Sequence, residues 1–461
     1  MKILLVIYDN DSQLHNFPIG LGYIAAVLKK HDYEVEIYQQ DLHHYPEEHL
    51  TKYLDDNHFD VVGLSIIGGF YQYQKCTRIS DAINRSKDRP FYVLGGHGPA
   101  AGPDFFLNKM GCDVIVIGEG ENTVINLFKA IENKRSLAGV RGIAYLDDGK
   151  LVESPREPLI KDIDSIPFPA FELFAIEYYR LLKSPNQRPS GFSLNIISGR
   201  GCTFKCNFCY RMDNGFRARS SSNIIAEIEL LKKDYGITWI NFHDELLMSS
   251  EKRATLLCED FIKANLNISW TCNGRLNYAR PKLLDLMKRA GCVCINYGIE
   301  AFDDQILKNM NKHLTTEQIV KGIEATLEVG ITPSYNVIFG NIGENEETLQ
   351  KGVDFLLKYD EGSSELRTIR PVTPYPGSPL FYYAIEKGFL KDCQDFYENK
   401  HTNSDLMSVN FTDLSDDEFH KALLKANTTL LENYFKNKMS AAIETARNLY
   451  LKKNSNFRGF R

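Results

Sequence analysis

Short apolar segments alternate with amphipathic segments over the first 135 residues of the chain. We interpret the apolar segments as strands, because several carry β-branched residues at successive positions, as strands buried on both faces do. Together with the helical spacing between them, the pattern predicts five strands and five helices. The expected strands are KILLVIY, EVEIYQQ, DVVGLSII, FYVLGG and DVIVIGEG. Strands that alternate with helices predict a doubly wound parallel sheet.

A hairpin and a linker are expected next. RGIAYLDDGKLVE predicts two short strands joined by a turn at Asp147, Asp148 and Gly149. The prolines of the following IPFPAFELF disfavour a regular helix, so we expect this segment to run over the surface as a linker.

A second alternating series follows the linker. Its six apolar segments are FSLNIIS, ITWINFHDE, NISWTCNGR, CVCINYGIE, ITPSYNVIFG and ELRTIRPV. Six strand and helix units are too few to close an eight-stranded barrel, so the pattern predicts an open, partial one. From Leu414 to Lys453 the pattern is helical and amphipathic.

These patterns place the chain in the α/β class and divide it into four parts. The parts are a doubly wound sheet in residues 1–140, a hairpin and linker in 141–190, a partial barrel in 191–400 and a helical segment in 401–461.

Composition and charge argue against several classes of protein. The formal net charge of −6, with acidic and basic residues interspersed, provides no broad basic surface for nucleic acid. No apolar run approaches the ~20 residues of a membrane-spanning helix, and Asp9 and Asp11 interrupt the start where a signal peptide would continue. The ten cysteines fit a reducing compartment, so we expect a cytoplasmic protein that acts on a small molecule or a peptide.

Three of the cysteines are clustered directly after the first strand of the expected barrel. In GRGCTFKCNFCYR, Cys202, Cys206 and Cys209 are close enough to bind three corners of one iron–sulfur cube. Such cubes usually take four cysteines, so three would leave one iron open to another ligand. Phe204 and Phe208 can cover the sulfurs and lower the local polarity.

Two alternatives use the same cysteines. Structural zinc would need a fourth protein ligand such as His243 or Cys258, and the second ligand pair of a typical zinc motif is missing from the sequence. A redox dithiol formed by Cys206 and Cys209 would leave Cys202 without a role.

The cysteine loop resembles the signature of the radical S-adenosylmethionine (SAM) superfamily, which has three cysteines with an aromatic residue, here Phe208, before the last. The resemblance implies a [4Fe-4S] cluster whose open iron is chelated by the amino and carboxylate groups of SAM. One electron from the cluster then cleaves SAM to methionine and a 5′-deoxyadenosyl radical. The resemblance also implies a partial barrel and an external low-potential electron donor of the flavodoxin or ferredoxin type.

Further candidate residues follow later strands of the expected barrel, at the end where parallel barrels place their chemistry. Asp244 and Glu245 resemble the acidic family motif that receives the amino group of SAM, and a carboxylate suits an ammonium. Asn273 and Arg275 could meet the carboxylate of SAM, and Glu300 resembles the segment near its ribose.

In the first part of the chain, ligands are expected beyond the carboxyl ends of the strands. Glycines at successive strand ends would let a large planar ligand approach the backbone. A dinucleotide would call for a G-x-G-x-x-G turn after the first strand, where this chain has DNDSQLHNFPIGLG. The candidate residues are Ser65, Ile66, Gly95, Gly96, His97, Gly118, Glu119, Gly120 and Glu121.

The combination of PIGLGYIAAVLKK, DVVGLSII, GGHGPA and VIVIGEGENT resembles the cobalamin-binding domain that precedes the barrel in one branch of radical SAM enzymes. With the hairpin, linker and barrel, the resemblance covers about residues 3 to 400. The broader cobalamin family has a D-x-H-x-x-G motif after the first strand, which this chain lacks around His15. We therefore expect no histidine below the cobalt, and a loop hydrogen bond for His97.

The two resemblances together imply a cobalamin-dependent radical SAM methylase of an unreactive carbon or phosphorus centre. An alternative is a cyclase or rearranging enzyme that uses cobalamin as an electron carrier, and another is a non-catalytic cobalamin or redox sensor. Cys292 and Cys294 alternate on a strand and are expected to share a face beside Cys272. We interpret these three cysteines as core residues and predict no second cluster.

Overall fold

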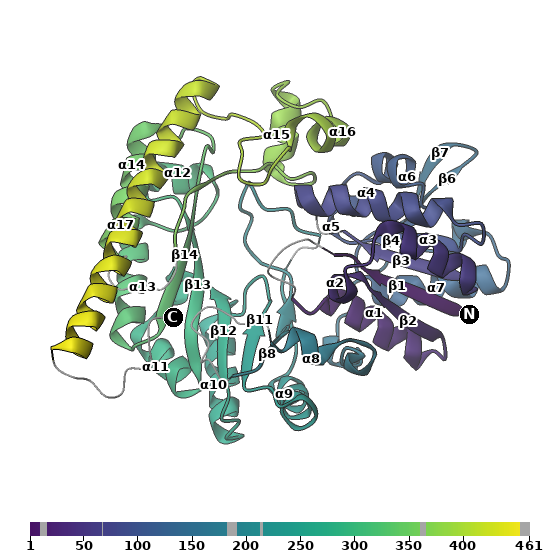
Figure 1. The fold of residues 1–461 in the computed structure, drawn as a ribbon, viewed down its shortest axis with the longest axis horizontal. Helices are drawn as coiled ribbons and strands as arrows, with labels where there is room; N and C mark the ends of the chain where they lie inside the picture. Colours follow the sequence, from purple (N-terminus) through teal and green to yellow (C-terminus); the bar gives the residue numbers. More distant parts are fainter. Residues whose placement is uncertain (10–15, 67, 182–190, 213–214, 360–365, 452–461) are drawn as a thin grey trace.

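The computed structural model describes residues 1–9, 16–66, 68–181, 191–212, 215–359 and 366–451. Two α/β bodies lie side by side, the first built on a seven-stranded sheet and the second on a six-stranded sheet (Figure 1). The long C-terminal helix lies against the second body, on the side away from the first.

The first sheet has the strand order β2-β1-β3-β4-β5-β6-β7, with β1 to β5 parallel and the hairpin β6 and β7 added antiparallel at one edge. The order reverses at β1, which makes this a doubly wound sheet with its switch point beside β1. The predicted sheet and hairpin are confirmed. The bounds are β1 Lys2–Ile7, β2 Glu34–Gln39, β3 Val61–Ser65, β4 Phe91–Gly95, β5 Val114–Val116, β6 Ile143–Asp147 and β7 Lys150–Glu153.

Helices cover both faces of this sheet, and β1 shows why. Its residues Ile3 and Leu5 point into the core under one pair of helices, whereas Leu4 and Val6 point into the core on the other face. The helices on the first face are α1 Ile19–Lys30 and α7 Gly120–Glu132, and those on the second are α3 Glu47–Asp56, α4 Phe70–Arg85 and α6 Pro103–Met110. Two short helices, α2 Gln40–His43 and α5 His97–Ala101, join the five that the pattern predicts.

The linker does not lie over the surface, and that expectation was wrong. It forms the short helices η2 Ile163–Ser165, η3 Phe171–Leu173 and α8 Ile176–Tyr179, and its apolar side chains enter the core shared by both bodies. The ring of Phe17 packs 5.3 Å from Phe171 and 5.1 Å from Phe174. Burial of these rings stabilises the fold, because moving each apolar side chain out of water contributes about 1.5–3 kcal/mol.

The second sheet has the order β15-β14-β13-β12-β11-β8, with every neighbouring pair parallel. The strands follow one another in sequence, and β8 and β15 are left as edges. The predicted open, partial barrel is thus confirmed. Its strands are β8 Ser193–Ile196, β11 Trp239–Phe242, β12 Ser269–Gly274, β13 Cys292–Glu300, β14 Thr332–Phe339 and β15 Arg370–Pro371.

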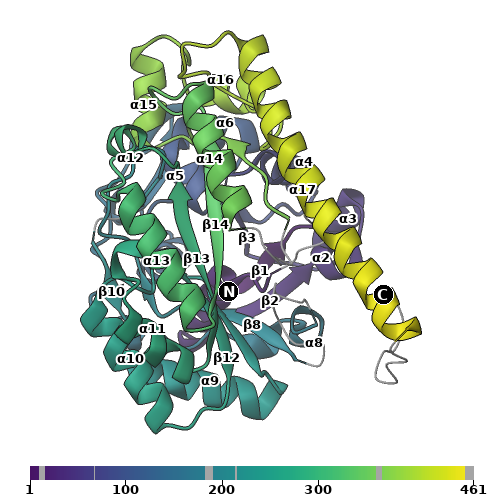
Figure 2. The same ribbon diagram turned by 90° about the vertical axis from the view of Figure 1, so that its left-hand side faces the viewer.

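Amphipathic helices cover the outer face of this sheet (Figure 2). They are α9 Ser221–Tyr235, α10 Glu251–Lys263, α11 Pro281–Arg289, α13 Thr316–Glu328 and α14 Glu346–Lys358. The C-terminal helix α17, Asp416–Tyr450, packs on α14 through Phe419, Leu423, Ala426 and Leu430. None of the described helices combines the length and apolar character that a membrane span requires.

The chain between β15 and α17 returns to the first body. It includes α15 Pro379–Glu386, α16 Cys393–Asp395 and a π-helical turn at Phe396–Lys400. In that turn the ring of Tyr397 stacks 4.8 Å from Tyr73 of α4, and Glu398 pairs with Lys109 of α6. These contacts hold the two bodies together on one side of the site.

Candidate cluster and cofactor site

The cysteine loop leaves the end of β8 and is closed at its base by a two-residue antiparallel ladder. The ladder pairs β9, Gly199–Arg200, with β10, Arg217–Ala218. Between ladder and cysteines, Gly201 has a φ of +85°, and a Cβ there would lie 2.4 Å from the carbonyl oxygen of Gly215. Only glycine fits this close approach, so the loop geometry is encoded by the residue directly before Cys202.

The three cysteines are free thiols that lie close together. Burial raises the pKa of Cys202, and the neighbouring Glu245 and Cys206 raise it further. Burial also raises the pKa of Cys209 to about 12, with Cys206, Glu300 and Glu245 adding to the effect and Lys312 opposing it. Cys206 contributes to the pKa of both other cysteines, so the three thiols lie in one neighbourhood. An iron–sulfur cube would take one thiolate at each of three corners.

Among the residues that the structure describes, no three His, Cys, Asp or Glu side chains, the loop cysteines included, are close enough to bind one metal ion. Cys258, one suggested fourth ligand, is fully buried in the core on the helix side of the sheet.

Backbone hydrogen bonds fix the middle of the cysteine loop. The N–H of Asn207 donates to the carbonyl of Met310 at 2.9 Å, and its carbonyl accepts from the N–H of Leu380 at 2.8 Å. The amide side chain of Asn207 donates to Asn341 Oδ1 at 2.9 Å. Three distant segments therefore position the loop, and the sequence reveals none of these contacts.

The two acidic residues after β11 point to different places. The carboxylate of Asp244 is buried and accepts from the N–H of Ser198 at 2.5 Å and from the Ser198 hydroxyl. Burial raises the pKa of Asp244, and the bonds from Ser198 oppose that rise. Glu245 acts on the pKa of Cys202 and Cys209 and so lies on the cluster side. Glu245 is the better placed of the pair to meet an ammonium beside the cluster.

Arg275 and Asn273 border the same site. The guanidinium of Arg275 lies 3.5 Å from the ring centroid of Phe204 in the cysteine loop and donates to the carbonyl of Lys312. Asn273 donates to the carbonyl of Asp244 at 2.8 Å, so its side chain joins β12 to the loop that follows β11.

Glu300 ends β13 in a left-handed conformation, with a φ of +70°. A non-glycine residue in this region is strained and often marks a functional position. Its carboxylate accepts from the ammonium of Lys312 at 2.9 Å, and that ammonium lies 5.7 Å from the ring centroid of Phe208. Lys312 could not be identified from the sequence, because nothing in its local pattern sets it apart from a surface lysine.

In the first body, the glycines at the strand ends expose bare backbone. A Cβ built on Gly95 or Gly118 would meet nothing within 4 Å, so these positions face open space. Gly96 has a φ of +99°, and a Cβ there would lie 2.2 Å from the carbonyl oxygen of Ile66. These glycines, Gly95, Gly96 and Gly118, form a cradle of exposed backbone that suits a large planar ligand, as expected for cobalamin. Ser65 ends β3 and is half-buried at the same edge.

The cradle and the cysteine loop contact each other. The exposed ring of His97, at the start of α5, meets the ring of Tyr210 edge-on at 6.0 Å between centroids, and Tyr210 directly follows Cys209. The carboxylates of Glu119 and Glu121 accept from Arg200 at 2.8 and 2.5 Å. His15, in the loop that would carry a lower cobalt ligand, lies outside the described residues.

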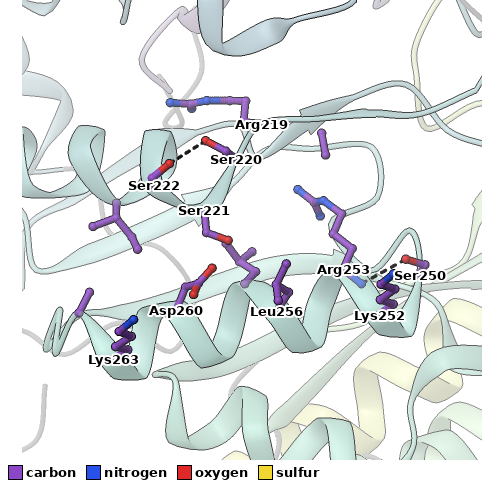
Figure 3. A pocket seen from close by; sticks show the side chains of 14 residues that line it. Arg219, Ser220, Ser221, Ser222, Ser250, Lys252, Arg253, Leu256, Asp260 and Lys263 are labelled. Carbon is purple, nitrogen blue, oxygen red and sulfur yellow. Dashed lines mark hydrogen bonds between the residues drawn. The ribbon is translucent and has the colours of Figure 1, made fainter.

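A cavity of about 800 Å³ lies elsewhere, between α9 and α10 (Figure 3). Its lining includes Arg219, Ser220, Arg253 and Leu256, and none of the residues predicted to bind a cofactor. Hydrogen bonds link this cavity to the cysteine site. Arg253, in the cavity lining, donates to the hydroxyl of Ser198, and that hydroxyl donates to the carboxylate of Asp244.

The other barrel cysteines lie in or beside the core. Cys272 and Cys292 are buried between the sheet and its helices. The expectation that Cys292 and Cys294 share a face was wrong, because the register between β12 and β13 shifts at Trp270 and Thr271. Both cysteines are buried, but Cys292 pairs with Trp270 and Cys294 with Thr271, and these two neighbours on β12 point to opposite faces.

Comparisons with known proteins agree with this architecture. The B12 binding domain model matches residues 7–128, which contain the cradle, and the Radical SAM superfamily model matches residues 196–356, which contain the three cysteines. An uncharacterized methyltransferase of Pyrococcus horikoshii is 29% identical over 401 residues, 85% of this chain and 84% of that protein. The anaerobic magnesium-protoporphyrin IX monomethyl ester cyclase of Rubrivivax gelatinosus is 29% identical over 394 residues, 82% of this chain and 68% of the cyclase.

A solved structure shares the whole arrangement. The radical SAM methyltransferase TsrM from Kitasatospora setae, with cobalamin and a [4Fe-4S] cluster bound, matches with a TM-score of 0.70 and 21% identity over 84% of this chain and 78% of that chain. This likeness confirms the fold. The two matched models place a B12 binding domain ahead of a radical SAM domain in this chain.

Proposed function

We propose that this enzyme is a cobalamin-dependent radical SAM methyltransferase that acts on an unactivated carbon or phosphorus centre of a small molecule. One observation carries the proposal: the open glycine cradle of the first body lies directly against the cysteine loop, through the contact of His97 with Tyr210. A methyl donor and a radical generator must act on one substrate, so their sites have to adjoin.

The chain provides distinct residues for each cofactor. Cys202, Cys206 and Cys209 would bind three irons of the cluster and leave the fourth to SAM. The carboxylate of Glu245 suits the ammonium of SAM, and the guanidinium of Arg275 suits its carboxylate. When bound, the cluster supplies the electron that cleaves SAM to methionine and a 5′-deoxyadenosyl radical, and cobalamin supplies the methyl group.

Other residues shape the site. Phe204 and Phe208 of the cysteine loop are partly buried and pack against the core. Glu300, held by Lys312, is oriented beside the cluster loop and is our candidate for contact with the ribose. These groups position cofactors and exclude water, while the hard chemistry belongs to the cofactors.

The enzyme would need an external low-potential electron donor of the flavodoxin or ferredoxin type. We further propose a cytoplasmic location, since reducing conditions preserve free thiols such as these. The match to a tetrapyrrole cyclase keeps cyclisation as the second candidate.

The test counts the products of SAM. Anaerobic protein with reconstituted cluster and added cobalamin is incubated with a low-potential reductant and SAM that carries a deuterated methyl group. A methyltransferase transfers the label to cobalamin and releases S-adenosylhomocysteine, and it forms 5′-deoxyadenosine from a second SAM. Formation of 5′-deoxyadenosine without S-adenosylhomocysteine would favour the cyclase, and absence of both products would favour a sensor. A metabolite comparison between wild type and a deletion strain would then identify the substrate.

A further inference from the structure

Four charged side chains join the cobalamin cradle to the base of the cysteine loop. Arg200 donates to Glu119 at 2.8 Å and to Glu121 at 2.5 Å. Arg217 donates to both carboxylate oxygens of Glu119 at 2.9 Å. Arg200 and Arg217 are direct partners in the β9–β10 ladder at the base of the loop, and both donate to the carboxylate of Glu119.

This set of four residues, the interdomain clamp, is well shielded from water. The side chains of Arg200, Arg217, Glu119 and Glu121 are 15%, 17%, 9% and 7% exposed. Burial tends to raise the pKa of Glu119, but the bonds from Arg200 and the N–H of Ile160 lower it overall. Two positive and two negative charges balance, and the guanidinium of Arg200 bridges the two carboxylates with one nitrogen on each.

The clamp residues are close in sequence to both cofactor sites. Glu119 directly follows Gly118, which faces the open cradle, and Arg200 is separated from Cys202 only by Gly201. The linker adds a third anchor, because Arg217 donates to the carbonyl of Ile160 at 2.7 Å. Two arginine side chains therefore connect the cradle loop with the base of the loop that carries the first cluster cysteine.

We propose that Glu119 and Glu121 are positioning residues rather than cobalamin ligands, and that through the clamp cobalamin binding and cluster assembly stabilise each other. Binding of either cofactor orders the clamp residues nearest to it and, through the ion pairs, the residues near the other site. The second cofactor then binds with a smaller loss of conformational entropy. Thermodynamic linkage makes the effect reciprocal. The inference rests on the proposed function only in that both cofactors must bind.

The clamp can be cut without separating the two bodies. The aromatic contact of His97 with Tyr210 and the linker core around Phe17 involve none of the four clamp residues. Neutral substitutions of similar shape, Glu119→Gln and Arg200→Gln, are therefore suited to the test. Glu121→Gln is a milder variant that leaves Glu119 paired with Arg217.

The experiment measures the Kd of hydroxocobalamin twice for each protein, by absorbance titration under anaerobic conditions. One sample carries the reconstituted cluster and the other is free of iron. For wild type we expect the cluster to tighten binding by about tenfold, within the usual range of such couplings. Glu119→Gln and Arg200→Gln should bring the ratio of the two Kd values below about twofold, and the double variant should lower it no further.

A matched control breaks a different ion pair between the two bodies. Lys109→Gln removes the partner of Glu398, which lies in neither loop of the clamp, and should keep the wild-type ratio. Arg200→Lys should give a small ratio, because a point charge cannot replace the fork that binds two carboxylates. Circular dichroism verifies folding, and if Glu119→Gln does not fold, Glu121→Gln decides the outcome.

Each result has a distinct reading. If wild type binds no cobalamin, the proposed function fails. If wild type binds cobalamin with equal affinity with and without the cluster, the clamp inference fails and the proposed function stands. A wild-type ratio in Glu119→Gln and Arg200→Gln, or a ratio lowered equally in Lys109→Gln, would also overturn the inference.

Discussion

The ammonium of Lys312 lies 2.9 Å from the carboxylate of Glu300, and both side chains are largely shielded beside the cluster loop. Glu300 is held there in a left-handed backbone conformation, and Lys312 also lies over the ring of Phe208. One ion pair thus joins the end of β13, the loop after α12 Asp304–Asn309, and the cysteine loop.

Lys312→Met should lower the free energy of unfolding by about 3 kcal/mol, because it leaves the carboxylate of Glu300 buried without a partner. Urea denaturation of anaerobic protein measures the loss. The double variant Lys312→Met with Glu300→Gln should recover part of it, since no uncompensated charge remains. As a control, Lys321→Met breaks the exposed pair with Glu317 and should have little effect. Equal losses in Lys312→Met and Lys321→Met would contradict the role of burial.

The three loop cysteines should be individually essential. Cys202→Ala, Cys206→Ala and Cys209→Ala should each abolish formation of 5′-deoxyadenosine, because two thiolates cannot hold a cube that keeps one iron for SAM. Chromatography of the products and iron analysis check this. Cys292→Ala, which changes a fully buried core cysteine, should keep the iron content of wild type. A variant of the loop that still cleaves SAM would disprove the cluster assignment.

Gly95→Leu should fold and yet bind hydroxocobalamin at least about tenfold more weakly. Its side chain would enter open space beyond β4, where the planar ligand is expected, and overpacking of a filled site costs about 1–3 kcal/mol. Gly139→Leu is the matched control, because a Cβ there also meets nothing within 4 Å, but Gly139 lies in the turn after α7. Absorbance titration compares the two variants, and equal affinities would place the cobalamin elsewhere.

The cobalt(II) form of the bound cobalamin should lack hyperfine splitting from a histidine nitrogen below the ring. The sequence after β1 has no D-x-H-x-x-G motif, and His97 is turned toward Tyr210. Electron paramagnetic resonance of the anaerobic complex tests this expectation. Strong nitrogen splitting would identify a histidine ligand.

The stability of the barrel should fall with rising pH because of Glu344. Burial raises its pKa to about 8, although the N–H groups of Gly340 and Asn341 donate to it at 2.7 Å. Between its unfolded value of 4.5 and about 8, the folded state binds more protons than the unfolded state, so stability decreases as pH rises. Glu344→Gln should gain about 2 kcal/mol relative to wild type between about pH 6 and about pH 8. Urea denaturation at the two pH values checks the change, and a constant difference would refute it.

Local sequence determined the secondary structure and the cluster loop. The uninterrupted run of apolar residues in β1 indicates that both of its faces are buried, and the two series of strands and helices follow from similar local patterns. Cys202, Cys206 and Cys209 are neighbours in the chain, and Gly201 sets the turn before them, so their proximity needs no tertiary information. The hairpin likewise follows from turn residues that are adjacent in sequence.

Pairs between distant residues were decided only by the fold. Glu119 and Arg200 are 81 positions apart, and Asn207 and Asn341 are 134 apart. Nothing in either local pattern distinguishes these side chains from solvated surface groups. The linker was misjudged for a related reason, because its prolines mark an irregular backbone but do not show that Phe171 enters a core.

The sequence by itself thus determined which segments form strands and helices, which residues make the cluster loop, and where the glycines expose backbone. Periodicity and turn preference are short-range properties, and each is written within a few residues. The tertiary structure alone decided that Glu119 and Glu121 clamp the base of the cysteine loop and that Lys312 accompanies Glu300. Such pairings depend on strand order and on how two sheets pack, and charged side chains acquire partners only when those larger elements are in place.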